Sequence, residues 1–130
     1  MRNLVLLATC LLLTVVALAR TITVDNDAPS DFNNIRAAID HSSDGDVIDI
    51  WAGTYQENIS FGGKVVKVTS TDPNGLGVVT STIIDANSQS SCVVFNHGED
   101  GNSGLEGFTL TNGIYAQIRR SSCVYCDIGS

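Results

Sequence analysis

The chain has 130 residues, enough for one ordinary domain, and a formal net charge of −7 at neutral pH. Hydrophobic residues make up 43% of it, which excludes a disordered chain. The acidic balance excludes binding to nucleic acid through its phosphates. After residue 19 no apolar run approaches the roughly 20 residues of a membrane span, so we expect no integral membrane domain.

Residues 1–19 follow the pattern of a secretory signal peptide. A short basic start contains Arg2, residues 4–19 carry no charge, and Ala17 and Ala19 are the small residues that precede a cleavage site. Cleavage after Ala19 would leave 111 residues, with six basic and fourteen acidic side chains. We expect a secreted or cell-surface protein, in the periplasm or on the outer-membrane surface if the source is Gram-negative. An uncleaved N-terminal anchor is the alternative.

Three cysteines remain beyond the expected cleavage site, so at most one disulfide can form. Cys123 and Cys126 have a spacing that suits a local disulfide, a redox couple or half of a zinc site. A zinc site would have to recruit Cys92 and His97, and no thioredoxin-like context surrounds the pair. A local Cys123–Cys126 disulfide, or two free thiols, is therefore the favoured interpretation, and no cofactor or metal is expected.

One helix is predicted over residues 31–41. Phe32, Ile35, Ala38 and Ile39 share one helical face, and polar residues occupy the others. The candidate N-caps are Ser30, Asp31 and Asn33.

The rest of the chain predicts short strands rich in Val, Ile and Thr, separated by Gly, Asn and Asp turns. The expected strands are residues 21–24, 47–51, 64–69, 81–85, 92–95 and 105–111. With a single helix, the pattern argues against alternating strands and helices. Irregular connections favour a solenoid, in which each strand pairs with its counterpart one coil away. A small β-sandwich is the alternative.

Several segments, in this order, resemble the opening coils of right-handed parallel β-helix proteins of the pectin-lyase-like superfamily. The matching stretches are 21–25, 31–39, 45–48, 53–59, 63–69, 82–85, 93–95 and 104–113. The opening is also similar to that of pectin methylesterases. The resemblance implies an all-β, right-handed parallel β-helix solenoid of about four coils, capped by an N-terminal α-helix and incomplete at its other end.

The same resemblance divides the chain into a signal peptide (1–19), β-helix coils (20–113) and an off-pattern tail (114–130). No position matches the catalytic residues of the family's lyases or esterases, so no catalytic residue is carried over. An open last coil would leave a strand edge free for self-association.

Three side chains are candidates for contacts at the surface. Trp51 and Tyr55 could stack on sugar rings, and packing in the core is the alternative for both. Asn58 begins a glycosylation sequon, which has meaning only in a eukaryotic source.

These observations predict an exported, non-catalytic module with a surface, adhesive or polysaccharide-binding role, whose partner is a polysaccharide or a cell-surface glycan. Two alternatives remain open. The chain is the N-terminal fragment of a polysaccharide-active enzyme, or it is a structural segment or truncated product without a function of its own.

Overall fold

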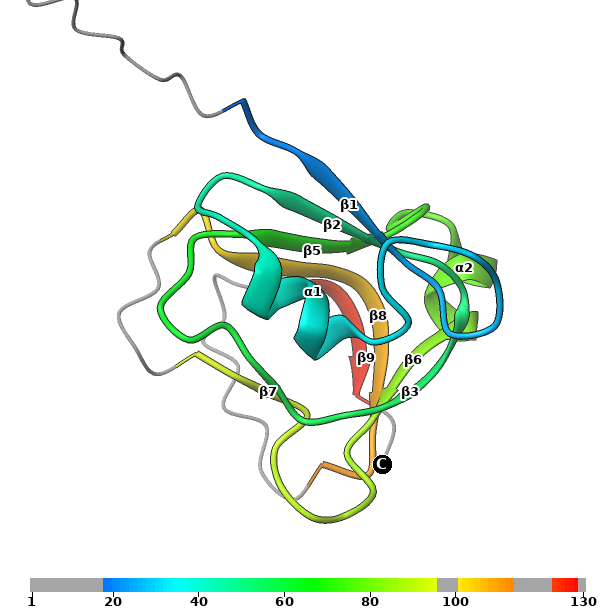
Figure 1. Ribbon diagram of the computed structural model, residues 1–130. Coiled ribbons are helices and arrows are strands. Elements are labelled where there is room, and N and C mark those ends of the chain that lie inside the picture. The colour runs from blue at the N-terminus through cyan, green and yellow to red at the C-terminus, as the bar shows by residue number, and fades with distance from the viewer. Residues whose placement is uncertain (1–17, 96–100, 114–122, 129–130) are drawn as a thin grey trace, which may run out of the picture.

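The computed structural model describes residues 18–95 and 101–113, and the backbone of residues 123–128. The described residues form nine short strands with two short helices between them, and consecutive strands do not always lie side by side (Figure 1). In chain order they are β1 (Thr21–Val24), α1 (Ile35–His41), β2 (Val47–Ile50), β3 (Gly53–Gln56), β4 (Ile59–Ser60), β5 (Lys67–Ser70), α2 (Leu76–Ser81), β6 (Thr82–Asp85), β7 (Val93–Val94), β8 (Gly104–Thr111) and β9 (Cys123–Ile128).

The main sheet has seven parallel strands in the order β1-β2-β5-β8-β6-β3, with β9 paired to β8. A second, two-stranded sheet joins β4 to β7, also in parallel. Parallel neighbours need a crossover connection, and α1 and α2 each lie in one of these crossovers.

The expectation of a right-handed parallel β-helix of about four coils is wrong. The described residues form a parallel sheet with helices, an α/β-like arrangement, and no closed solenoid is present among them. The error came from taking the chain to hold one helix. Leu76–Ser81 forms the second helix although it contains Gly77 and two valines. Its N-cap residue, Gly75, has no side chain that could form a capping hydrogen bond. These residues are weak helix formers, so the sequence pattern hid α2.

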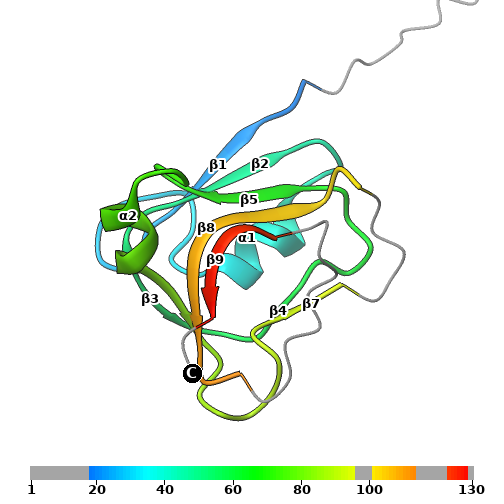
Figure 2. The same cartoon turned by 180° about the vertical axis from the view of Figure 1, so that it is seen from behind.

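Strand β8 is bent, and this bend shapes the sheet. Its first residues pair with β5 and its last residues pair with β6. At the junction Gly107 has φ +78°, and the alternation of buried residues breaks because Gly107 and Phe108 are both buried. Gly107 therefore lies where β8 turns from its first partner toward its second (Figure 2).

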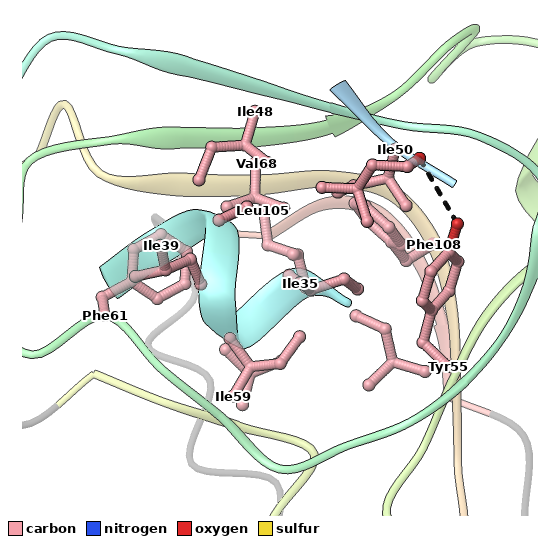
Figure 3. Close-up of a cluster of buried hydrophobic side chains, with 14 of the residues drawn as sticks. Ile35, Ile39, Ile48, Ile50, Tyr55, Ile59, Phe61, Val68, Leu105 and Phe108 are labelled. Carbon is pink, nitrogen blue, oxygen red and sulfur yellow. Dashed lines mark hydrogen bonds between the residues drawn. The ribbon is translucent and has the colours of Figure 1, made fainter. Parts of the chain in front are cut away.

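The core lies on the inner face of this sheet. The strand register aligns Ile22, Ile48, Val68 and Leu105 across β1, β2, β5 and β8, and all four side chains are buried. Helix α1 covers this row and contacts β1, β2 and β4 (Figure 3). Helix α2 lies on the opposite face of β8, where Thr109 donates a hydrogen bond to the carbonyl of Val79 at 2.9 Å.

The prediction of a helix facing the core with Ile35, Ala38 and Ile39 is confirmed, because all three are buried. The predicted start at residue 31 is too early. Asn34 is the N-cap, and its side-chain oxygen accepts a hydrogen bond from the Ala37 amide at 2.8 Å. Phe32 stays extended and forms a parallel bridge with Val24.

Side chains from later in the chain bind both ends of α1. The Glu57 carboxylate accepts hydrogen bonds from the backbone amides of Ile35 and Arg36, at 2.8 and 2.9 Å. The Lys64 ammonium donates to the carbonyls of Ile39, Asp40 and Ser42, at 2.6 to 2.8 Å. These contacts satisfy the amides and carbonyls that every helix leaves unpaired at its ends.

In the part of the chain that the structure describes, neither helix is long or apolar enough to cross a membrane.

Candidate functional site

A hollow of about 340 Å³ lies where the start of β1, the loop before α1 and the end of α1 meet. This volume falls in the range of sites for small ligands, about 300–1,000 Å³. Its lining residues are Arg20, Thr21, Ile22, Asp31, Phe32 and His41.

The acidic group of the hollow is held in one position. Asp31 Oδ2 accepts hydrogen bonds from the amide and the hydroxyl of Thr23, at 2.9 and 3.0 Å, and the Asp31 amide donates back to the Thr23 hydroxyl at 3.2 Å. The bonds from Thr23, first from its amide and then from its hydroxyl, lower the pKa of Asp31 below the ordinary carboxyl value. The hollow therefore presents a fixed carboxylate at neutral pH.

The basic group is anchored by a buried acid. Arg20 Nη2 lies 3.1 Å from Oδ2 of Asp46, whose side chain is 3% exposed, whereas the Arg20 side chain is 55% exposed. Asp46 also accepts hydrogen bonds from the amides of Ser43 and Arg20, at 2.9 and 3.0 Å. These two amides are the main cause of the lowered pKa of Asp46, and the Arg20 guanidinium adds to it. The exposed part of the guanidinium is free to face a ligand.

Two aromatic side chains complete the hollow. The rings of Phe32 and His41 are 5.3 Å apart between centroids and tilted by 49°. Phe32 is half-buried and packs against the core, whereas His41 is exposed at the last position of α1. The two rings form an apolar wall of the hollow, and the imidazole of His41 can form hydrogen bonds there.

Together these groups can bind a polar ligand that carries hydroxyl groups and an apolar face. Asp31 accepts hydrogen bonds, Arg20 donates them, and the Phe32 ring offers a flat surface. The lining residues include no cysteine or serine that could act as a nucleophile. Among the described residues, no group of three His, Cys, Asp or Glu side chains is placed to hold a metal ion.

The structure separates the two aromatic residues predicted at the surface. Trp51 is 52% exposed and follows β2, and its amide donates to the carbonyl of Val24. Tyr55 is 2% exposed and points into the cluster of buried side chains (Figure 3). Its hydroxyl donates to the carbonyl of Trp51 at 2.8 Å. Burial, the largest cause, raises the pKa of Tyr55 to about 12. Tyr55 is thus a core residue that a sugar cannot reach, whereas the Trp51 side chain remains accessible.

The sequon residue Asn58 is half-buried, and its Nδ2 atom donates to the carbonyl of Ser91 at 3.0 Å. The structure gives this amide a role in tying β4 to the segment before β7. Cys123 and Cys126 lie in β9, and their side chains are outside the described residues. Cys92 is a free, buried thiol whose pKa is raised by burial.

Sequence reasoning missed the hollow because its residues come from three segments that only the fold brings together. The sequence pattern places Asp31 and Phe32 in the helix, and it does not single out Arg20. No family model, curated protein or solved structure matches the chain.

Proposed function

We propose that this chain is an exported glycan-binding module that holds a sugar residue in the hollow at Arg20, Asp31 and Phe32. The observation that carries the proposal is the fixed carboxylate, guanidinium and aromatic ring around one volume of about 340 Å³. Sugars combine hydroxyl groups with apolar C–H faces, and these three side chains match both features. The leader-like residues 1–19 support a location outside the cytoplasm, in solution or at the cell surface.

We propose binding without bond cleavage. Glycoside hydrolysis needs a pair of carboxyl groups, one of which stays protonated near neutral pH so that it can donate a proton. The hollow offers a single carboxyl group, Asp31, and its lowered pKa keeps it ionised. An ionised carboxylate binds hydroxyl groups well and is a poor proton donor. Release of unsaturated sugars or methanol from pectin by the purified chain would contradict this part of the proposal.

The test is binding to immobilised acidic and neutral polysaccharides, followed by titration calorimetry with the best oligosaccharide. We expect Asp31→Asn to weaken binding about tenfold or more, since a hydrogen bond to a charged group contributes roughly 1.5–3 kcal/mol. The matched control is Asp27→Asn, an exposed acid of the same loop that does not line the hollow. Absence of binding to any polysaccharide, or equal binding by both variants, would overturn the proposal.

Trp51 extends the proposal to a second contact. It is the sole tryptophan of the chain, and its ring is half exposed. Trp51 follows the end of β2, whereas Thr21 of the hollow pairs with Val47 at the start of β2. We therefore propose that Trp51 stacks on another sugar of a longer chain. We expect Trp51→Ala to weaken binding of long oligosaccharides and to leave binding of a single sugar residue unchanged. Equal losses for both lengths would show that Trp51 acts through the fold instead.

A further inference from the structure

The backbone nitrogen of Arg20 lies against a buried acid. It donates to Oδ1 of Asp46 at 3.0 Å, and the Arg20 carbonyl accepts from the Val47 amide at 2.9 Å. Residue 20 is therefore already held against the start of β2, one position before β1 begins. Residues 18–20 are exposed, and Leu18 is 81% exposed, so the segment that leads into Arg20 lies on the surface.

The Asp46 carboxylate is buried, and most of its hydrogen-bond donors are neutral. Its side chain is 3% exposed, and among the described residues its one cationic partner is the Arg20 guanidinium, which is 55% exposed. The remaining partners are the neutral amides of Ser43 and Arg20. A buried carboxylate is stabilised much more by a charged donor at hydrogen-bond distance than by an amide.

We propose that Asp46 is the receptor for the α-ammonium group that proteolytic cleavage between Ala19 and Arg20 creates. The inference rests on the exported part of the proposed function and is independent of glycan binding. The cleavage site is the one that the small residues Ala17 and Ala19 predict.

The covalent step is hydrolysis by an endopeptidase. Water adds its hydroxyl group to the carbonyl carbon of Ala19, the C–N bond breaks, and the nitrogen of Arg20 leaves as an amine. An α-amine has an ordinary pKa of about 7.7–8.0, so it takes up a proton at neutral pH. The same nitrogen that donated to Asp46 Oδ1 as a neutral amide becomes a charged ammonium, so a salt bridge replaces the amide–carboxylate hydrogen bond.

The proposed ion pair would stabilise the part of β1 that lines the hollow. Arg20, Thr21 and Ile22 line it, and β1 is an edge strand of the sheet, bonded on one side to β2. An ion pair at the first residue fastens this edge strand where fraying would otherwise begin. Cleavage thus couples removal of the leader to stabilisation of the binding surface.

The decisive comparison uses two chains that differ by one residue, released from a removable N-terminal fusion: residues 20–130 and residues 19–130. Both carry the same net charge, and only the first places its ammonium at Asp46. We expect the 20–130 chain to unfold about 4 °C or more higher, and its α-amine pKa to lie above about 8. The 19–130 chain should keep an ordinary α-amine pKa. Asp31 and His41, the other ionisable groups that line the hollow with Arg20, are identical in both chains.

Acetylation of the α-amine of the 20–130 chain should remove its advantage, and so should Asp46→Asn in both lengths. The length comparison and the acetylation stand even if Asp46→Asn does not fold. Equal unfolding temperatures and equal α-amine pKa values for the two lengths would overturn the inference. N-terminal sequencing of the exported chain should give Arg20 first, and another first residue would overturn the cleavage step while leaving the glycan-binding proposal to its own test.

Discussion

Glu57 and Lys64 bind opposite ends of the same helix. The Glu57 carboxylate covers the amides at the N-terminus of α1, and the Lys64 ammonium covers the carbonyls at its C-terminus. Each charge also complements the helix dipole at the end where it lies. A helix of seven residues has little stability of its own, so these two side chains and the buried face of α1 determine that it forms.

Replacing Glu57 by Gln should lower the free energy of unfolding by about 1–2 kcal/mol, because two hydrogen bonds to a charged acceptor become bonds to a neutral amide. Urea unfolding followed by circular dichroism measures the change. The control is Gln56→Ala, an exposed neighbour in β3, which should change stability by less than about 0.5 kcal/mol. A Glu57→Gln chain as stable as this control would contradict the prediction.

Replacing Lys64 by Met removes the ammonium and keeps the aliphatic stem. We expect a loss of about 1–2 kcal/mol, because three backbone carbonyls at the end of α1 lose a charged donor. Lys67→Met is the matched control, since Lys67 pairs with Glu106 at 3.0 Å in a partly exposed ion pair that contributes about 0–1 kcal/mol. If both variants lose the same free energy of unfolding in urea, the contacts between Lys64 and the three carbonyls add no stability beyond that of a surface ion pair.

Gly107→Ala should be severely destabilising, by about 3 kcal/mol or more. The residue has φ +78°, and an added Cβ would meet the Ser70 hydroxyl and would lie 2.5 Å from Cα of Pro73. Gly77→Ala is the control: no atom lies within 4 Å of its added Cβ, and alanine in helix α2 should stabilise by about 0.5–1 kcal/mol. Thermal unfolding of the two variants should therefore shift in opposite directions.

We expect the buried Asp46 carboxylate to make the stability of the protein depend on pH in acid. Its pKa is lowered in the folded chain, chiefly by the amides of Ser43 and Arg20, so the folded state binds its proton less readily than the unfolded state. The stability this provides is present above the ordinary carboxyl pKa of about 3.9 and is lost as the pH falls through the lowered value. Asp46→Asn should make the free energy of unfolding fall less steeply as the pH is lowered from about 6 to about 2. Chemical unfolding at each pH measures this change. Asp40→Asn, at an exposed position of α1, is the control for loss of one surface carboxylate.

Local patterns predicted the elements well where one face is buried. The strand at residues 21–24 is found as expected, and the predicted strands at 81–85 and 105–111 overlap β6 and β8 to within one residue. The prediction failed where tertiary contacts outweigh local preference. Gly53–Gln56 has the sequence of a turn, but pairs in parallel with β6 because Tyr55 inserts into the core.

The architecture could not be predicted from the sequence for a related reason. Short parallel strands with uneven connections suit several arrangements, and the choice among them depends on α2 and on the bend at Gly107. Neither has a clear local signal, because α2 is made of weak helix formers and a glycine inside a strand has several explanations. The candidate site depends on the same long-range placement, which brings Arg20 and His41 to one hollow.

The two ends of α1 are completed by residues that follow it in the chain, and this imposes an order on folding. As the polypeptide is made, the helical segment precedes both Glu57 and Lys64, so a nascent chain that ends before them has no partner for either helix end. The segment should stay unstructured until residue 64 is available, because a single isolated turn or two of helix does not persist in water. A translocation channel accepts an unfolded chain, so this delay in folding is compatible with the export that we propose.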